Sequence, residues 1–340
     1  MDERADLARR CRELVEELGL ARAEDVVGVE PLTGGVASDI ARVELRDGLV
    51  FCAKFALPRL RVVEEWRAPV RRNRAEYAWL GVAARIVPEN AVRLFGRSER
   101  LHGFVMEYLG GPAVRNWKAE LLAGRILPGV AAALGDLVGR IHAASARPDF
   151  DRAPFRNMED FRALRIEPYL LFTATRHPDL APRLEGLAHM LERAHRALVH
   201  GDVSPKNVLV RAGRPLLLDA ECATMGDPAF DPAFCVNHLL LKAVHMPHLA
   251  SALRGEASAF LSAWLRHVDF EDRAGLEARV AGLVPALMLA RVDGKSPVEY
   301  LDGHGRARVR RIARRLLVEP PRRVGDLFDR ALAPDGGGDG

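Results

Sequence analysis

The 340-residue sequence predicts an α+β protein of two lobes, a small one built on an antiparallel sheet and a larger, mainly helical one. Three observations support this layout. Between residues 26 and 109, short segments alternate polar and apolar residues with a period of two, as half-buried strands do. Gly110-Gly111-Pro112 then interrupts the pattern. Beyond it, apolar residues recur mostly at helical spacing, so we expect an N-terminal lobe over residues 1–109 and a C-terminal lobe over residues 110–332.

The small lobe is predicted to begin with a helix over residues 2–18 and to continue with five strands and one further helix. The first helix follows from the shared face of Leu7, Cys11, Leu14, Val15 and Leu18. The strand candidates are "VVGVEPL", "DIARVELRD", "LVFCAKF", "AVRLFG" and "GFVMEYL", with the second helix between the third and fourth, around residues 66–85. In the large lobe, "LVHGDVSPKNVLV" and "PLLLDAEC" are short apolar strands among helices. Residues 333–340 are too rich in glycine to be ordered.

The composition argues against several classes of function. Apolar residues make up 49% of the chain and charged residues 28%, as in a globular protein. The net charge is +4, but Lys and Arg are scattered among acidic residues, so we expect no nucleic-acid partner. No apolar segment approaches the ~20 residues of a membrane span, and the charged N-terminus does not resemble a signal peptide. We therefore expect a cytoplasmic protein that binds a small molecule and no membrane.

One apolar segment carries an unusual group of polar residues. "LVHGDVSPKNVLV" places His200, Asp202, Lys206 and Asn207 among valines and leucines, where desolvating polar groups is costly unless they serve a purpose. Farther along the chain, "LLLDAE" adds Asp219 and Glu221. A lone His-Gly-Asp is most often a turn with an Asx-type hydrogen bond, but the ordered set indicates a catalytic site.

This ordered set resembles the catalytic and metal-binding segments of the aminoglycoside phosphotransferase and choline kinase superfamily, which shares the protein-kinase-like fold. The resemblance implies ATP and Mg²⁺ as cofactors, Asp202 as the catalytic residue that orients the attacking hydroxyl, and Asn207 and Asp219 as metal ligands. Asp-x-Glu is similar to choline kinases and methylthioribose kinases, so Glu221 is a further candidate metal ligand; a solvent-facing strand end is the alternative. "GDPAFD", residues 226–231, also resembles a segment found in many members.

The resemblance further implies a lysine for the nucleotide phosphates. In "VFCAKF" the period of two puts Cys52 and Lys54 on one strand face, which we expect to line the nucleotide pocket. Glu76 on the following helix is the expected partner of Lys54, with Glu64 and Glu65 as alternatives. The remaining predicted nucleotide contacts are a turn over the phosphates with Gly34, Gly35 and Ser38, and a hinge with Met106, Glu107 and Leu109. An ordinary Gly-Gly hairpin is the alternative for the turn.

The acceptor is less well defined by the sequence. Lys206 is expected to extend into solvent rather than touch the γ-phosphate. "ARVDGKSPVEYL", residues 290–301, interrupts the C-terminal helices and offers Arg291, Asp293 and Glu299 as acceptor contacts; a helix-capping turn is the alternative. The prediction is an ATP-dependent phosphotransferase acting on a hydroxyl of a sugar or similar polyhydroxylated metabolite. The alternatives are an aminoglycoside or amino-sugar kinase and, from another class, a non-catalytic pseudokinase.

Overall fold

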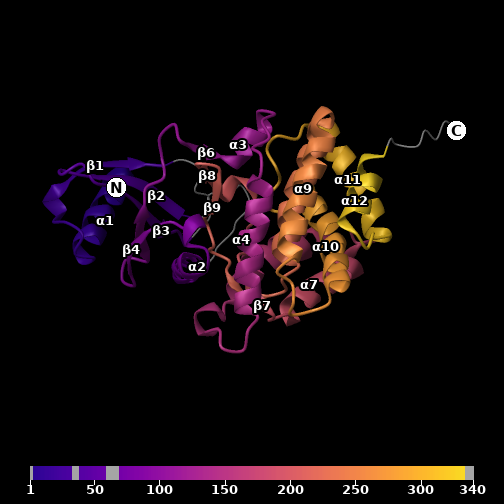
Figure 1. Ribbon diagram of the computed structural model, residues 1–340, viewed down its shortest axis with the longest axis horizontal. Coiled ribbons are helices and arrows are strands. Elements are labelled where there is room, and N and C mark those ends of the chain that lie inside the picture. Colours follow the sequence, from indigo (N-terminus) through magenta and orange to yellow (C-terminus); the bar gives the residue numbers. More distant parts are fainter. Residues whose placement is uncertain (1–2, 33–37, 59–68, 334–340) are drawn as a thin grey trace.

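The computed structural model describes residues 3–32, 38–58 and 69–333. Gly34 and Gly35, Glu64 and Glu65, and residues 334–340 of the predicted tail lie outside the described residues. Within them, the N-terminal residues form a lobe built on a sheet, and the rest of the chain forms a helical lobe beside it (Figure 1). The predicted α+β layout is therefore confirmed.

The N-terminal lobe is a five-stranded sheet with strand order β1-β2-β3-β5-β4, and all of its strand pairs are antiparallel. The strands are β1 Val26–Pro31, β2 Ser38–Leu45, β3 Val50–Ala56, β4 Leu94–Ser98 and β5 Gly103–Glu107. Helix α1 (Glu3–Glu17) packs on one face, and α2 (Arg72–Ile86) packs on the other. All five predicted strands are present; α2 begins at Arg72, not near residue 66.

Strand β3 shows why the period of two matters. Phe51 and Phe55 are buried in the core that α1 covers. Cys52 lies on the other face, in the core that contains Trp79 of α2. Lys54, two residues farther along the strand, is on the same face and reaches α2. The predicted register of this strand is confirmed.

Helices make up most of the C-terminal lobe. Their bounds are α3 Trp117–Leu122, α4 Val130–Ser145, α5 Met158–Phe161, α6 Phe172–Arg176, α7 Ala181–Arg193, α8 Phe230–His245, α9 Ala250–Leu265, α10 Arg273–Asp293, α11 Gly303–Val318 and α12 Val324–Leu332. A π-helix, Arg162–Leu171, lies between α5 and α6. Helix α8 is buried on every side except at its last residue and packs against α9 and α10. A helix buried all round lies at the centre of a large core, and its polar residues Asp231, His238 and Lys242 are buried with it.

Two small sheets accompany these helices. β7 (Ala197–Val199) pairs with β10 (Thr224–Gly226), and β6 (Val114–Asn116), β8 (Val208–Arg211) and β9 (Arg214–Leu217) form a second sheet in the order β6-β8-β9. The loop from β7 to β8 carries "HGDVSPKN", and the loop from β9 to β10 carries "DAEC". The short sheets therefore bring the two polar segments together.

One prediction about these strands is wrong. The strand predicted for "PLLLDAEC" includes Asp219 and Glu221, but β9 ends at Leu217. Asp219 has a φ of 72°, in the left-handed region that Asp tolerates better than most residues. The chain therefore leaves the extended conformation at Asp219.

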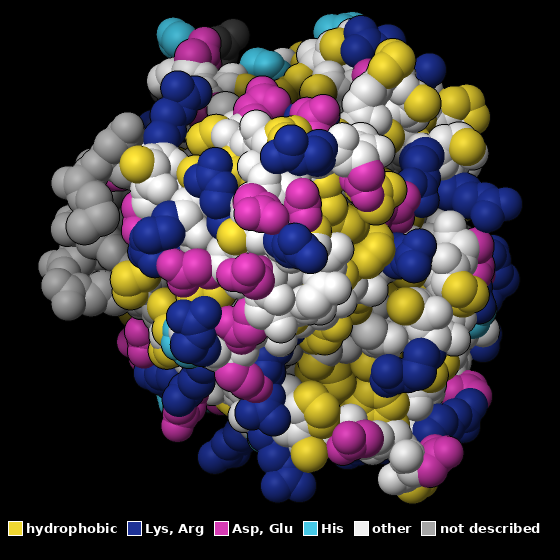
Figure 2. Space-filling view, turned by 90° about the vertical axis from the view of Figure 1, so that its left-hand side faces the viewer, with side chains coloured by type: hydrophobic (Ala, Val, Ile, Leu, Met, Phe, Trp, Pro, Cys, Tyr) yellow, Lys and Arg dark blue, Asp and Glu magenta, His cyan; other side chains and the backbone are white. Residues whose placement is uncertain are grey.

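A continuous core joins the lobes, since Cys52 and Met106 of the sheet pack in the same cluster as Leu134 of α4. β5 ends at Glu107 and β6 begins at Val114, so the predicted boundary after residue 109 falls in this link and stays a prediction. Of the described helices, none is both long and apolar enough to span a membrane. Basic and acidic side chains are interspersed on the face shown in Figure 2.

Candidate active site

The loop that contains His200 and Asp202 is held in place by Asp231, at the start of α8. The two carboxylate oxygens of Asp231 accept the backbone N–H groups of His200 at 2.7 Å and of Gly201 at 2.8 Å. Gly201 has a φ of 81°, and a Cβ at this position would lie 2.7 Å from the Cβ of Cys222. Glycine is therefore required here, and the loop has one well-defined shape.

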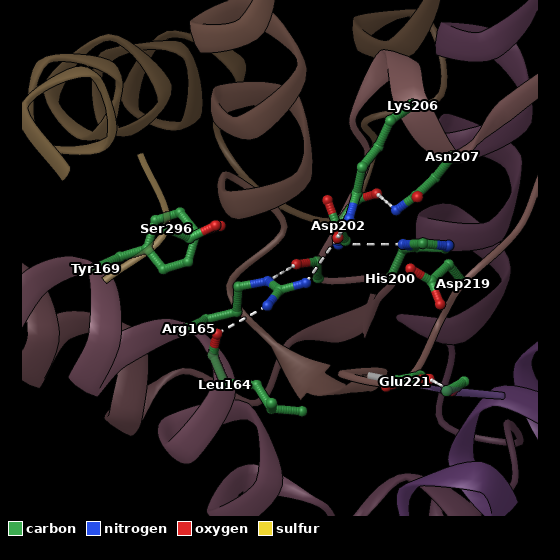
Figure 3. A network of polar contacts seen from close by, with 12 residues as sticks. Leu164, Arg165, Tyr169, His200, Asp202, Lys206, Asn207, Asp219, Glu221 and Ser296 are labelled. Carbon is green, nitrogen blue, oxygen red and sulfur yellow. Dashed lines mark hydrogen bonds and ion pairs between the residues drawn. The ribbon is translucent and has the colours of Figure 1, made fainter. Parts of the chain in front are cut away.

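Asp202 lies at the centre of this loop and contacts two cations (Figure 3). Arg165 Nη2 is 2.9 Å and Lys206 Nζ is 3.6 Å from Asp202 Oδ2. The amide of Asn207 donates to the Asp202 carbonyl at 3.1 Å. Burial opposes ionisation of Asp202, but Lys206 and Arg165 outweigh it and hold the pKa of the carboxyl below its usual value. Asp202 is thus a charged acceptor at neutral pH.

The structure adds a contact to the position expected for Lys206. Its side chain is exposed to solvent, as expected, and its ammonium group also lies 3.6 Å from Asp202. Residues Pro205–Asn207 form a 3₁₀ turn, which brings residues 202 and 206 to the same side of the chain. The charge of Asp202 is the main reason why the pKa of Lys206 is raised.

Arg165 is a site residue that the sequence did not predict. It lies in the π-helix, donates to the carbonyls of Gly201 and Leu164, and is buried with 8% of its surface exposed. Its guanidinium lies 5.7 Å from the ring centre of Tyr169. No motif marks Arg165, but Pro168 within the same helical pattern signals irregular geometry, and π-helices are frequent at functional sites.

Three carboxylates surround Lys54 on the other side of the site. The ammonium Nζ is 2.7 Å from Glu76, 2.5 Å from Asp219 and 3.3 Å from Glu221. The predicted ion pair between Lys54 and Glu76 is therefore present. Burial by itself would lower the pKa of Lys54, but the three carboxylates, Asp219 first, raise it well above its usual value. Lys54 is charged and links strand β3, helix α2 and the loop after β9.

Glu221 is held by partners on both of its oxygens. Ser38 donates to Oε1, and Arg72 Nε lies 2.8 Å from Oε2. Arg72 is fully buried and also donates to the carbonyls of Leu57 and Pro69. Arg72 is a second residue that the sequence did not predict. Ser38, expected to contact phosphates, supports Glu221 in this structure.

The residues around Lys54 fit a divalent metal ion. Oxygens of Glu76, Asp219 and Glu221 lie within 4.8 Å of one another. Asp219 is the most exposed of the three, with 33% of its side chain accessible. The amide nitrogen of Asn207 donates to the Asp202 carbonyl. The amide oxygen, which is the atom that would bind a metal ion, takes no part in this hydrogen bond. Two hard oxygen ligands from Asp219 and Asn207 suit Mg²⁺, whereas both oxygens of Glu221 already have protein partners.

The predicted hinge residues lie on β5 and just beyond it. Met106 is the register partner of Cys52 on β3, so these two side chains are neighbours. The Glu107 carboxylate pairs with Arg211, and the Glu107 amide donates to the Arg93 carbonyl at 2.8 Å. Burial raises the pKa of the Cys52 thiol to about 12, so the thiol stays protonated at neutral pH. Leu109 is half-buried in the link between the lobes.

The structure separates the three predicted acceptor residues. Arg291 donates to the hydroxyl of Tyr169 at 3.3 Å, close to Arg165. Glu299 forms an ion pair with Lys118 of α3. Asp293, by contrast, is bound by His177 at 2.8 Å and by Arg310 at 2.6 Å. Asp293 therefore belongs to a network that ties α10 to α11 and does not join the other two.

Comparisons with known proteins agree with this geometry. Residues 28–267 match the family model described as "Phosphotransferase enzyme family". The methylthioribose kinase of Pectobacterium carotovorum subsp. carotovorum is 26% identical over 260 residues, which cover 68% of this chain. The same match covers 64% of that protein, so the chain spans less than two thirds of its relative's length.

Two solved structures share the fold over almost the whole chain. An amicoumacin kinase in complex with AMP-PNP, Ca²⁺ and Ami has a TM-score of 0.58 and 14% identity, and the match covers 97% of this chain and 99% of that one. A choline/ethanolamine kinase family protein from Mesorhizobium loti has a TM-score of 0.54 and 18% identity, with coverage of 95% and 98%. The predicted protein-kinase-like fold is therefore confirmed.

Proposed function

The chain belongs to the phosphotransferase enzyme family, and we propose that it transfers the γ-phosphate of ATP to a hydroxyl group of a small metabolite. The observation that carries this proposal is the environment of Asp202. This carboxylate is 5% exposed, fixed by Arg165 and kept ionised by two cations. A buried, charged carboxylate with a fixed orientation suits a group that orients a hydroxyl nucleophile.

In this reaction Asp202 accepts the hydrogen bond of the acceptor's hydroxyl and takes its proton as the oxygen attacks phosphorus. A new O–P bond forms while the bond from the γ-phosphorus to the bridging oxygen breaks, and ADP leaves. Arg165 keeps the Asp202 carboxylate in one orientation. Lys206 lies 3.6 Å from that carboxylate and supplies positive charge where the phosphoryl group is transferred.

The charged group around Lys54 supports the nucleotide part of the proposal. Lys54, oriented by Glu76, binds phosphate oxygens, and Asp219 and Asn207 hold Mg²⁺. The metal ion, when bound, neutralises phosphate charge. Cys52, Met106 and the backbone of Glu107 and Leu109 line the adenine site in this proposal. The turn with Gly34 and Gly35 over the phosphates stays a prediction, and Ser38, predicted with it, donates to Glu221. The solved amicoumacin kinase with AMP-PNP and Ca²⁺ supports a nucleotide with a divalent ion.

The methylthioribose kinase relative favours a sugar or similar polyhydroxylated acceptor. An aminoglycoside or amino sugar carries positive charge, which Lys206 and Arg165 beside Asp202 would repel. A pseudokinase is the alternative of another class. It is less well supported, because Asp202, Asn207 and Asp219 are all retained.

A screen for ADP formation with Mg²⁺ and a panel of hydroxylated metabolites tests the proposal. We expect at least one sugar or polyol to stimulate ATP consumption in the wild type and not in Asp202→Asn. ATP binding without turnover for every acceptor would favour the pseudokinase. Turnover that survives in Asp202→Asn would assign the chemistry to another residue.

A further inference from the structure

The few lysines of this chain are concentrated near the proposed site. Only five of the 50 Lys and Arg residues are lysine. Lys54 lies on the nucleotide side, and Lys206 contacts Asp202. Lys118 pairs with Glu299, and Lys242 lies 5.2 Å from the ring centre of Tyr300, the next residue in the chain. Arg165, Lys206, Lys118, Lys242 and Arg291 are called the cationic group here.

Lys242 is the most unusual member of the group. It lies on α8 and is only 1% exposed. Its ammonium group donates to the His238 carbonyl at 3.4 Å and lies 5.2 Å from the ring centre of Tyr300. Among residues 3–32, 38–58 and 69–333, no carboxylate lies within ion-pair distance of Lys242. A buried ammonium without a counter-ion is costly unless a ligand supplies the missing charge.

The other cations lie close enough to act on Lys242. Burial first, and then the charges of Lys118 and Arg291, lower the pKa of Lys242 to about 7, against the opposing charge of Glu299. Burial and then the neighbouring cations, Arg291 first, lower the pKa of His238, one turn earlier on α8, well below the usual value. The Lys242 ammonium lies beside Tyr300, and Lys118 pairs with the preceding residue, Glu299, so the geometry also places these two lysines near each other.

A chain of contacts connects Lys242 to the catalytic residue. Phe234, His238 and Lys242 are spaced four residues apart, so they lie on one face of α8. The Phe234 ring lies 5.6 Å from the Arg165 guanidinium and 5.2 Å from the His238 ring. Arg165 in turn binds Asp202. Asp202 is thus connected to Lys242 through Arg165 and this face of α8.

Arg291 reaches the same place from α10. It donates to the hydroxyl of Tyr169 and to Ser296, and the ring centre of Tyr169 lies 5.7 Å from the Arg165 guanidinium. In the described part of the chain, Arg291 Nε and the hydroxyl of Tyr300 are buried without a hydrogen-bond partner. Both are donors, and donors suit the oxygens of an anion.

The charge balance of the group is positive. Its direct carboxylate partners are Asp202, shared by Arg165 and Lys206, and Glu299, which pairs with Lys118. We propose that the acceptor carries an anionic group, a carboxylate or a phosphate, which binds Lys242 and Arg291 while the acceptor's hydroxyl lies at Asp202. This inference rests on the proposed function, and it defines the acceptor as a hydroxylated acid or a phosphorylated polyol.

Binding of matched compounds tests the proposal. The protein is loaded with Mg²⁺ and AMP-PNP at fixed ionic strength, and calorimetry or NMR compares compounds that differ in one group. Glycerol, erythritol and ribose are the neutral members; glycerate, erythronate and ribonate carry a carboxylate; glycerol 3-phosphate and ribose 5-phosphate carry a phosphate; glucosamine against glucose adds an amine. The carboxylate and phosphate arms distinguish the two anions.

We expect at least one anionic compound to bind 10-fold or more tightly than its neutral counterpart. Lys242→Met and Arg291→Met should each remove most of this difference. Arg254→Met is the matched control, because it removes one positive charge at a half-exposed residue that pairs with Asp329 of α12. The control should keep the full preference for the anion.

Equal or tighter binding of the neutral or amine members throughout the panel would overturn the proposal. A preference for anions that survives in both Lys242→Met and Arg291→Met would also overturn it. ADP formation with ATP separates this inference from the proposed function. Phosphorylation of a neutral acceptor alone would keep the kinase and reject the anion site. Anion binding that depends on Lys242, without phosphorylation of any bound compound, would support the anion site and count against the kinase.

Discussion

Two lysines are equally buried in this site and have opposite surroundings. Lys54 is 3% exposed and lies within 3.3 Å of three carboxylates. Lys242 is 1% exposed, and its charged neighbours are mainly Lys118 and Arg291. Burial disfavours the charged form of both lysines. The carboxylates outweigh it and raise the pKa of Lys54, whereas burial and the two cations lower the pKa of Lys242 to about 7.

In the two proposals made above, surrounding charge, not burial, determines which ligand each half of the site binds. Excess carboxylate around Lys54 favours a divalent cation together with nucleotide phosphates. Excess positive charge around Lys242 favours an anion. Asp202 is held by Arg165 and Lys206 and pairs with neither Lys54 nor Lys242. Each prediction below tests one of the two halves, or Asp202 and its partner Arg165.

The largest expected effect is that of Asp219→Asn on the nucleotide half. Asparagine keeps the shape and tolerates the φ of 72°, but it removes the charge that faces Lys54. Lys54 keeps Glu76 and Glu221, so the fold should persist. We expect ADP formation to fall to background and the Mg²⁺ dependence of nucleotide affinity to weaken. An unchanged Mg²⁺ dependence in nucleotide titrations would show that Asp219 is not the ligand.

Asp202→Asn should slow turnover by a factor of about 10²–10⁴, the usual cost of losing a general base. The affinity for Mg²⁺ and ATP should stay at the wild-type level, because Asp202 contacts Arg165 and Lys206 and not Lys54. Single-turnover kinetics and nucleotide titration measure the two quantities separately. A loss of nucleotide affinity as large as the loss of rate would place Asp202 in the nucleotide half.

Arg165→Met should reduce kcat by about 10–10², because the Asp202 carboxylate loses the partner that fixes its orientation. The KM for ATP should change little. Arg162→Met is the matched control on the same π-helix, since Arg162 is half-exposed and pairs with Glu167 and Glu192. Steady-state kinetics on both variants decide the outcome. Equal effects of the two substitutions would mean that Arg165 acts only through the stability of the helix.

Local sequence patterns were enough to predict the strands of the small lobe and the polar residues of the candidate site. The period of two in "VFCAKF" put Cys52 and Lys54 on one face, and the ordered motif singled out Asp202, Asn207 and Asp219. The Lys54–Glu76 pair followed from the resemblance, which places such a glutamate on the helix after β3. Each of these features depends on residues close in sequence or on a motif with fixed spacing.

The remaining features depend on contacts between distant segments. Arg165 reaches Asp202 from an irregular helix, and Arg72 reaches Glu221 from the start of α2, without a motif in either case. Asp293 lies in the same predicted acceptor segment as Arg291, but it binds His177 and Arg310 and so belongs to a different network. A charged side chain can bind a ligand or hold two helices together. Its residue type does not distinguish these roles, and only its packing partners do.

The smallest predicted effect concerns the stability contributed by Lys242. Its pKa is about 7 in the folded protein and 10.5 in the reference state. Above pH 10.5 the lysine is neutral in both the folded and the unfolded chain. Between pH 10.5 and 7 only the unfolded chain binds the proton, so the folded state loses stability as the pH falls. Below about pH 7 both states are charged, and the loss is complete.

Lys242→Met should therefore raise the free energy of unfolding at pH 6, because methionine fills similar space without a charge to desolvate. The gain should shrink at pH 9, by at most about 1.4 kcal/mol for each pH unit between 7 and 9. Urea unfolding of wild type and variant at the two pH values measures both quantities. Arg254→Met should show no such pH dependence, since Arg254 is half-exposed and paired. A variant less stable than the wild type by the same amount at both pH values would mean that Lys242 has a counter-ion within the protein, and the contrast with Lys54 would then disappear.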